Sequence, residues 1–209
     1  MSTLAARPVL TETFWKTSGS QVWLKRLVLV VAGVAAMAIA AKIRVPMWPV
    51  PITMGTFAIL TVGAAYGPRL GLGTVLAYLA VGALGFDVFA GSSAEKYGLA
   101  YMMGGTGGYL VGYALAALAL GWFARQGWDR SFGWMALALF VGNVIIYVPG
   151  LLWLGQLFGW DQPILACGLW PFLVGHGLKL VLSALVVPGL CKLVGNARAR
   201  SQHGDFRNA

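Results

Sequence analysis

The 209-residue chain is 59% hydrophobic and only 10% charged, and its mean hydropathy is +0.77. Soluble globular domains carry about a quarter of their residues as charged side chains, so the composition excludes that class and indicates an integral membrane protein. The net charge of +9 does not predict a nucleic-acid partner, because the basic residues gather at the ends of apolar segments.

The apolar segments predict an all-α integral membrane protein with six transmembrane helices and both termini in the cytoplasm. Placing the termini inside assigns eleven of the fifteen basic residues to the inner side and three to the outer side, as the positive-inside rule requires. The predicted units are a cytoplasmic N-terminal tail (1–22), the transmembrane domain (23–194) and a basic cytoplasmic C-terminal tail (195–209). The predicted spans are 27–41, 52–66, 70–86, 99–124, 132–157 and 170–194.

The first span carries a stripe of alanines. Ala32, Ala36 and Ala40 recur every fourth residue and therefore lie on one face of a helix, where small side chains let another helix approach closely. Their spacing leaves open whether that helix belongs to this chain or to another protein.

Three prolines in residues 46–51 predict a stiff, irregular connection after the first span. Trp48 lies within it, either as part of a lid over a cavity or as an anchor at the membrane interface. Further on, Gly67, Pro68 and Arg69 predict a tight inner turn, and the many glycines that follow it indicate close helix packing.

The fourth span begins with the glycine-rich stretch 101–109, which includes Tyr101 and Tyr109. It contains neither of the complete glycine-rich signatures of nucleotide binding, so no ATP site is predicted. We interpret it as a slim helix start that neighbours or a ligand can approach. In the fifth span, Asn143 and Tyr147 lie one helical turn apart.

The sixth span contains a lysine, Lys179, roughly 13 Å from its aromatic start at Trp170. A central lysine costs about 2.5 to 3.5 kcal/mol in membrane insertion, so it needs water, a partner or a ligand. His176 lies on the same helical face. Two interpretations are open: the lysine reaches toward an interface or a carbonyl group, or it lies in a binding cavity.

The sequence contains no metal-ligand cluster and no paired carboxylates within a span, so we expect neither an enzyme nor a cofactor. Ser183 and His176 are compatible with a serine hydrolase only in spacing. Polar residues concentrate toward the outer halves of the last three spans, which favours a ligand pocket open to the outside over a continuous pore.

Several motifs in order resemble the BioY family, the biotin-specific substrate-binding components of energy-coupling factor (ECF) vitamin transporters. They cover nearly the whole chain: Val50-Pro51-Ile52-Thr53, Gly67-Pro68-Arg69, Val88-Phe89-Ala90-Gly91, Thr106-Gly107-Gly108-Tyr109-Leu110 and Ile146-Tyr147. The resemblance implies an ECF S-component-like bundle in the cell membrane that captures biotin from outside. It also implies a separate coupling protein and two ATPases that drive transport.

The resemblance assigns roles to individual positions. Ala32, Ala36 and Ala40 correspond to the family's surface for docking the coupling protein, and the loop around Trp48 would close over the vitamin. The residues predicted to bind biotin are Lys179, His176, Asn143, Tyr147, Trp48, Thr53, Tyr101 and Tyr109.

The chain departs from the family pattern at three positions. His176 stands where an aspartate is expected, Gly55 where a glutamine is common and Gly105 where a proline is common. A histidine accepts a hydrogen bond only through an unprotonated ring nitrogen, so biotin binding is expected to weaken at acid pH. Two other functional classes stay open: a biotin carrier that works without ATPases, and a structural membrane subunit without a ligand.

Overall fold

The computed structural model describes residues 8–14, 21–45, 52–92 and 97–169, together with 186, 187 and 189. Three of its helices, α2, α5 and α6, are long and apolar enough to cross a membrane. In chain order the elements are α1 (Leu10–Phe14), α2 (Gln21–Lys42), β1 (Arg44–Val45), β2 (Ile52–Thr53), α3 (Gly55–Ala83), α4 (Gly98–Met102), α5 (Gly107–Arg125), the 3-10 helix η1 (Trp128–Arg130), α6 (Phe132–Phe158) and α7 (Ile164–Gly168).

Helix α3 is two helices joined at a sharp turn. Gly67 has φ 79° and ψ 175°, a backbone conformation that is essentially restricted to glycine, and Pro68 follows it. Gly63 and Gly71 would be roughly 12 Å apart in a straight helix. Instead, a Cβ added to Gly71 would lie only 3.1 Å from the Gly63 Cα atom. The chain therefore reverses at Gly67, which confirms the turn predicted between the second and third spans.

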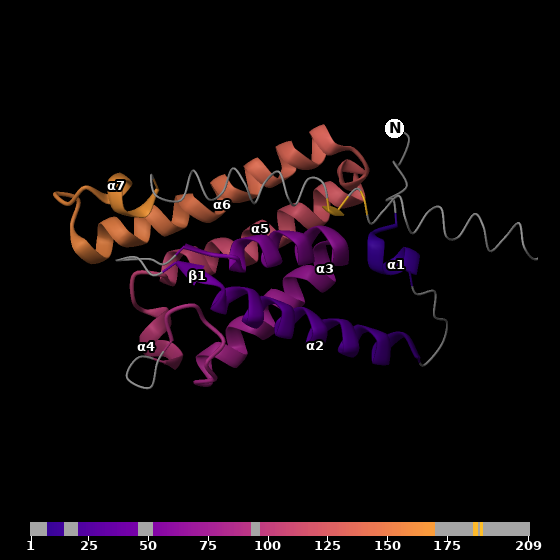
Figure 1. Cartoon of the computed structure of the whole chain (residues 1–209), viewed down its shortest axis with the longest axis horizontal. Helices are drawn as coiled ribbons and strands as arrows, with labels where there is room; N and C mark the ends of the chain where they lie inside the picture. The colour runs from indigo at the N-terminus through magenta and orange to yellow at the C-terminus, as the bar shows by residue number, and fades with distance from the viewer. Residues whose placement is uncertain are drawn as a thin grey trace, which may run out of the picture.

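Helix α5 packs against α3 on one side and α6 on the other through glycines (Figure 1). An added Cβ at Gly121 would lie 2.4 Å from the Gly67 carbonyl carbon, and one at Gly112 would lie 2.7 Å from the Ile146 Cα atom. Side chains larger than hydrogen would separate these backbones. Among the glycines of the third span, from which close packing was predicted, Gly71 packs tightly against Gly63, whereas Gly73 has open space beside it.

Helix α2 packs against both halves of α3. An added Cβ at Gly33 would lie 2.6 Å from the Thr74 Cγ2 atom, and the Tyr66 hydroxyl donates a hydrogen bond to the Leu29 carbonyl oxygen at 3.0 Å. Met37, on the same side of α2, is fully buried. The opposite side of α2 is exposed, including Leu27, Val31 and Ile39.

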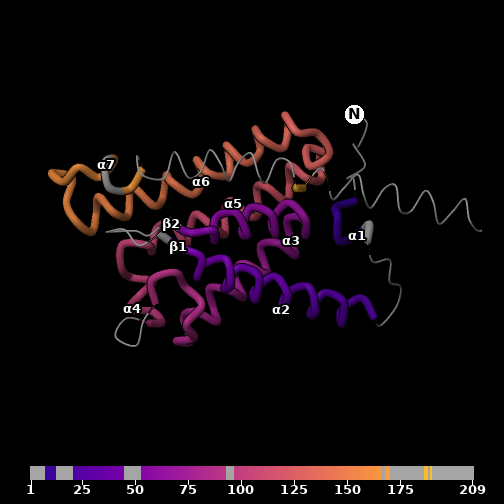
Figure 2. The backbone as a smooth tube through the Cα atoms, in the orientation of Figure 1, coloured from indigo at the N-terminus to yellow at the C-terminus, as the bar shows by residue number. Residues whose placement is uncertain are grey.

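The two ends of the bundle differ. At one end α1 lies near the α3 turn, with Val9 fully buried against Gly67 and Glu12 paired with Arg125 at 2.5 Å. The strands β1 and β2, helix α4 and helix α7 lie toward the other end (Figure 2). Among the described residues, α1 and the α3 turn, which were predicted to be inside, thus lie at the opposite end of the bundle from β1 and α7, which were predicted to be outside.

The predicted starts of the second and fourth spans were wrong. Ile52 and Thr53 do not begin a helix but pair antiparallel with Arg44 and Val45, so helix α3 starts at Gly55. The expected span 99–124 is interrupted after the short helix α4, and the long helix α5 starts at Gly107. The irregular connection predicted at 46–51 and most of the sixth span, 170–194, lie outside the described residues.

Replacing Gly67 with alanine should destabilise the chain, because a Cβ atom is strained at this φ and ψ and would crowd Val9. We expect the free energy of unfolding to fall by about 1 to 3 kcal/mol. Gly73→Ala is the matched control, since this exposed helical glycine has nothing within 4 Å, and it should stabilise by roughly 0.5 to 1 kcal/mol. Unfolding by SDS titration in detergent micelles measures both, and equal effects would contradict the assigned turn.

Candidate ligand-binding site

A cavity of about 50 Å³ lies among α3, α5 and α6. Strand β2 and the loop that follows α3, on the side predicted to be outer, also contribute to its wall. This volume has room for several water molecules. Its wall is mainly aromatic and apolar, with a few hydroxyl groups. The lining residues include Ala41, Thr53, Gly55, Thr56, Tyr78, Phe89, Ala90, Tyr101, Thr106, Tyr109, Leu110, Tyr113, Ile146 and Tyr147.

Three of the lining tyrosines use their hydroxyl groups to bind the backbone of nearby segments. Tyr78 donates to the Val88 carbonyl oxygen at 2.9 Å, and Tyr109 donates to the Gly168 carbonyl oxygen at 2.9 Å. Tyr101 accepts a hydrogen bond from the Gly91 amide at 3.1 Å. Each tyrosine therefore gives the cavity a flat apolar ring while its polar end holds a segment at the cavity margin.

Phe89 forms part of the wall although it belongs to a loop. Its ring is 2% exposed, stacks on Tyr101 with centroids 5.2 Å apart and meets Tyr78 edge to face at 5.4 Å. Gly82 makes room for it, because an added Cβ there would lie 2.1 Å from the Phe89 Cζ atom. The ring thus fills a gap that only a glycine leaves on α3.

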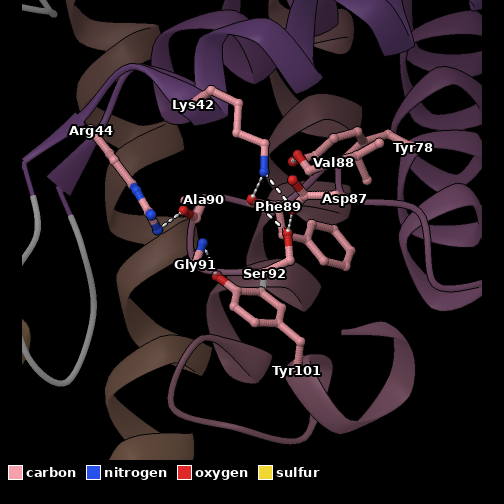
Figure 3. Close-up of polar contacts among 10 residues, drawn as sticks. All are labelled: Lys42, Arg44, Tyr78, Asp87, Val88, Phe89, Ala90, Gly91, Ser92 and Tyr101. Atoms are coloured by element: carbon pink, nitrogen blue, oxygen red, sulfur yellow. Dashed lines mark hydrogen bonds and ion pairs between the residues drawn. The ribbon is translucent and has the colours of Figure 1, made fainter. Parts of the chain in front are cut away.

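The loop that carries Phe89 is bound to the C-terminal end of α2 by polar contacts (Figure 3). The Lys42 Nζ atom lies 2.5 Å from the Asp87 Oδ1 atom and donates to the Phe89 carbonyl oxygen at 3.0 Å. The Ser92 hydroxyl also binds Asp87. Arg44 donates to the Ala90 carbonyl oxygen from strand β1.

The Asp87 carboxyl group is ionised at neutral pH. Hydrogen bonds first from the Lys42 ammonium and then from the Ser92 hydroxyl lower its pKa from the ordinary value. The pairing is therefore complete at neutral pH and is lost only as the pH falls through this lowered pKa.

Two threonines place hydroxyl groups at the cavity. Thr53 is positioned by the β1–β2 pairing, and its Oγ1 atom accepts a hydrogen bond from the Gly55 amide at 3.0 Å. The Thr56 hydroxyl is buried and has no hydrogen-bond partner among the described residues. A buried hydroxyl without a partner costs free energy, so Thr56 is a natural contact for a polar ligand atom.

The structure brings four of the predicted site residues together: Thr53, Tyr101, Tyr109 and Tyr147 all line the cavity. Asn143 does not line it. Its side-chain amide donates to the Leu139 carbonyl oxygen one turn back on the same helix, at 2.8 Å. Trp48, His176 and Lys179 lie outside the described residues.

Other lining residues were missed by the sequence analysis. Phe89 belongs to a motif that supported the family resemblance but received no role, and Tyr113 follows Tyr109 by one helical turn, a spacing that could have predicted it. Tyr78 and Thr56 had no distinguishing sequence signal. Of the two glycines that depart from the family pattern, Gly55 lines the cavity.

The alanine stripe on α2 is mostly outside the core. Ala32 and Ala36 are exposed, whereas Ala40 is partly buried against the cluster that contains Met37 and Phe89. A free surface of small side chains therefore exists at Ala32 and Ala36.

Comparison with known proteins places this chain among transporters. Residues 11–196 match the model of the BioY family. The probable biotin transporter BioY of Pyrococcus horikoshii is 32% identical over 166 residues, which cover 79% of this chain and 96% of the relative. The biotin transporter BioY of Thermotoga maritima is 33% identical over 167 residues, which also cover 79% of this chain and 96% of the relative.

A solved structure has the same fold. The crystal structure of the S-component for biotin from an ECF-type ABC transporter superposes on this chain with a TM-score of 0.70 at 25% sequence identity. The superposition covers 84% of this chain and 95% of that one.

Proposed function

Because this chain belongs to the BioY family, we propose that it captures biotin on the outer side of the cell membrane and delivers it inward as the substrate-binding subunit of an ATP-driven ECF transporter. The observation that carries the proposal is the aromatic cavity with the Thr56 hydroxyl, which has no partner in the described part of the chain, in a protein that superposes on nearly the whole of a biotin S-component. The names of the curated relatives support the same ligand.

The proposal includes six membrane-spanning helices with both termini in the cytoplasm. The turn at Gly67 and the separation of the predicted inner and outer segments support an arrangement in which successive spans alternate in direction. The Glu12–Arg125 pair then lies at the cytoplasmic end, and the cavity lies toward the outer end. Basic residues concentrate on the cytoplasmic side.

The cavity suits the chemistry of biotin. The vitamin has a planar ureido group with two donors and one acceptor, a sulfur-containing ring, an apolar chain and a carboxylate. Tyr101, Tyr109 and Phe89 offer apolar walls to the rings and the chain, and Thr56 offers a hydroxyl to a polar atom. We propose that Trp48, His176 and Lys179 complete the site, with Lys179 as its strongest polar contact.

The energy for transport comes from other subunits in this proposal. The sequence contains no complete phosphate-binding signature, so ATP hydrolysis requires partner proteins. The exposed alanines Ala32 and Ala36 on α2 offer a surface on which a helix of a coupling protein can pack closely.

Lys179→Met should weaken biotin binding roughly 10- to 100-fold, since a hydrogen bond to a charged group contributes about 1.5 to 3 kcal/mol. Labelled-biotin titration of the purified, folded variant measures the change. Lys25→Met is the control. Lys25 lies near the start of α2, at the opposite end of this helix from Lys42, and its replacement should leave biotin binding as in the wild type. Unchanged affinity of the Lys179 variant would remove this residue from the site.

Thr56→Val should weaken biotin binding by about fivefold, because the isosteric change removes one hydrogen bond worth about 1 kcal/mol. Thr61→Val is matched closely: the Thr61 hydroxyl is also buried without a partner among the described residues, but Thr61 does not line the cavity. Equal effects of the two substitutions on the biotin dissociation constant would show that Thr56 acts through stability alone.

Ala36→Trp should abolish co-purification with a coupling protein and leave biotin binding intact, because the indole prevents close helix approach. Ala35→Trp, also exposed on α2 but about 100° around the helix, is the control and should still associate. Loss of biotin binding with normal association would reverse the assignment.

Biotin uptake by cells that lack coupling protein and ATPases, with and without an uncoupler, separates this proposal from a self-sufficient carrier. The proposal predicts no accumulation in such cells. Accumulation that an uncoupler abolishes would indicate an ion-coupled carrier instead.

A further inference from the structure

One wall of the cavity depends on contacts that lie outside it. The loop 84–92 follows the end of α3 and contributes Phe89 and Ala90 to the lining. Its direction is set at Gly85, which has φ 98°, where only glycine is unstrained. After that turn the loop belongs to no helix or strand; the Phe86 amide still donates to the Val81 carbonyl oxygen at 3.4 Å, and side-chain contacts hold the residues that follow.

Lys42 contacts this loop at two points. Its ammonium group binds the Asp87 carboxylate at 2.5 Å and the Phe89 carbonyl oxygen at 3.0 Å, so it contacts the residues on both sides of Val88. The Ser92 hydroxyl lies within hydrogen-bond reach of the same two groups, at 2.9 Å from the Phe89 oxygen. Lys42 is the last residue of α2, where a positive charge is also favoured by the helix dipole.

These contacts act on the backbone of the residue whose ring forms the wall. The Phe89 carbonyl oxygen faces Lys42, and the Phe89 ring lies against Gly82 and Tyr101 (Figure 3). The Lys42 and Asp87 side chains are 39% and 66% exposed, so the pair is solvated. Solvated ion pairs add little to global stability, and the effect of this pair is therefore local to the loop.

We infer that Lys42 and Asp87 are positioning residues that clamp the loop 84–92 to α2, keep Phe89 in the cavity wall and so slow the departure of the bound ligand. Neither side chain lines the cavity. The identity of the ligand as biotin rests on the proposed function, but the clamp itself is defined by contacts within the protein.

The clamp is tested first without ligand, by hydrogen exchange of the purified protein in detergent. The Val88 amide donates to the Phe86 carbonyl oxygen within the loop, and the Gly91 amide donates to the Tyr101 hydroxyl. Both amides should exchange about tenfold faster in Lys42→Met and Asp87→Asn, because a released loop breaks these hydrogen bonds more often. Peptides from α5 should exchange as in the wild type. Lys42→Arg should restore slow exchange, and the double variant should exchange no faster than the faster single variant.

Biotin dissociation is the second readout. The dissociation rate constant should rise about 5- to 30-fold in Lys42→Met and Asp87→Asn, with a smaller change in the association rate constant. Lys25→Met and Asp161→Asn are the matched controls, because they remove a lysine from the other end of α2 and an exposed carboxylate from another loop. Both controls should behave like the wild type.

Two results would overturn the inference. Unchanged exchange of the loop in both variants would show that the ion pair does not hold it. Faster exchange with an unchanged biotin dissociation rate would show that the held loop does not retain the ligand. If the wild type itself binds no biotin, the proposed function fails, and the exchange experiment alone decides the clamp.

Discussion

The close approach of α5 to its two neighbours is the constraint on which this structure depends. Apolar side chains gain little by leaving lipid for a helix interface, so helices in a membrane associate mainly through tight van der Waals contact. Gly121 provides such contact beneath the α3 turn, and Gly112 provides it against α6. On either side of Gly112, α5 contributes Tyr109 and Tyr113 to the cavity, so the close crossing of α5 with α6 places both rings in its wall.

Several polar side chains in this apolar bundle bind backbone groups of neighbouring segments. The hydroxyls of Tyr78, Tyr101 and Tyr109 bind backbone groups of the segments around the cavity. The walls are thus made by rings from helices, and the margin is held by the polar ends of the same side chains. Helix α2 has two proposed roles. Its C-terminal residue Lys42 holds the loop that carries Phe89, and its exposed alanines offer a surface for docking the coupling protein.

Much of this arrangement follows from local sequence signals. Gly67 and Pro68 predicted the turn because few other residue pairs permit that backbone, and the long apolar segment 132–157 predicted α6 to within one residue. The break before α5 falls at residues 103–106, which include Gly104 and Gly105, and this glycine-rich stretch was predicted to lie inside a continuous span. The pairing of Ile52 with Val45 depends on the chain meeting itself across residues 46–51, which no local pattern encodes.

The candidate site could likewise be predicted from the sequence only in part. Tyr109 and Tyr147 belong to motifs that resemble the BioY family, and both line the cavity. Asn143 shares the face of Tyr147 by spacing, but its amide binds the Leu139 carbonyl oxygen of its own helix. Lys42 and Asp87 are 45 residues apart in the sequence. The sequence alone therefore indicated only that both lie on the outer side, and their pairing could be recognised only in the folded structure.

The central claim is that this cavity binds biotin, and native mass spectrometry of the intact protein tests it most directly. The wild-type chain, purified in detergent from cells supplied with biotin, should carry one biotin molecule that survives gel filtration and exchanges with labelled biotin. Folded protein that carries no biotin, or that carries a different small molecule unaffected by added biotin, would contradict the account.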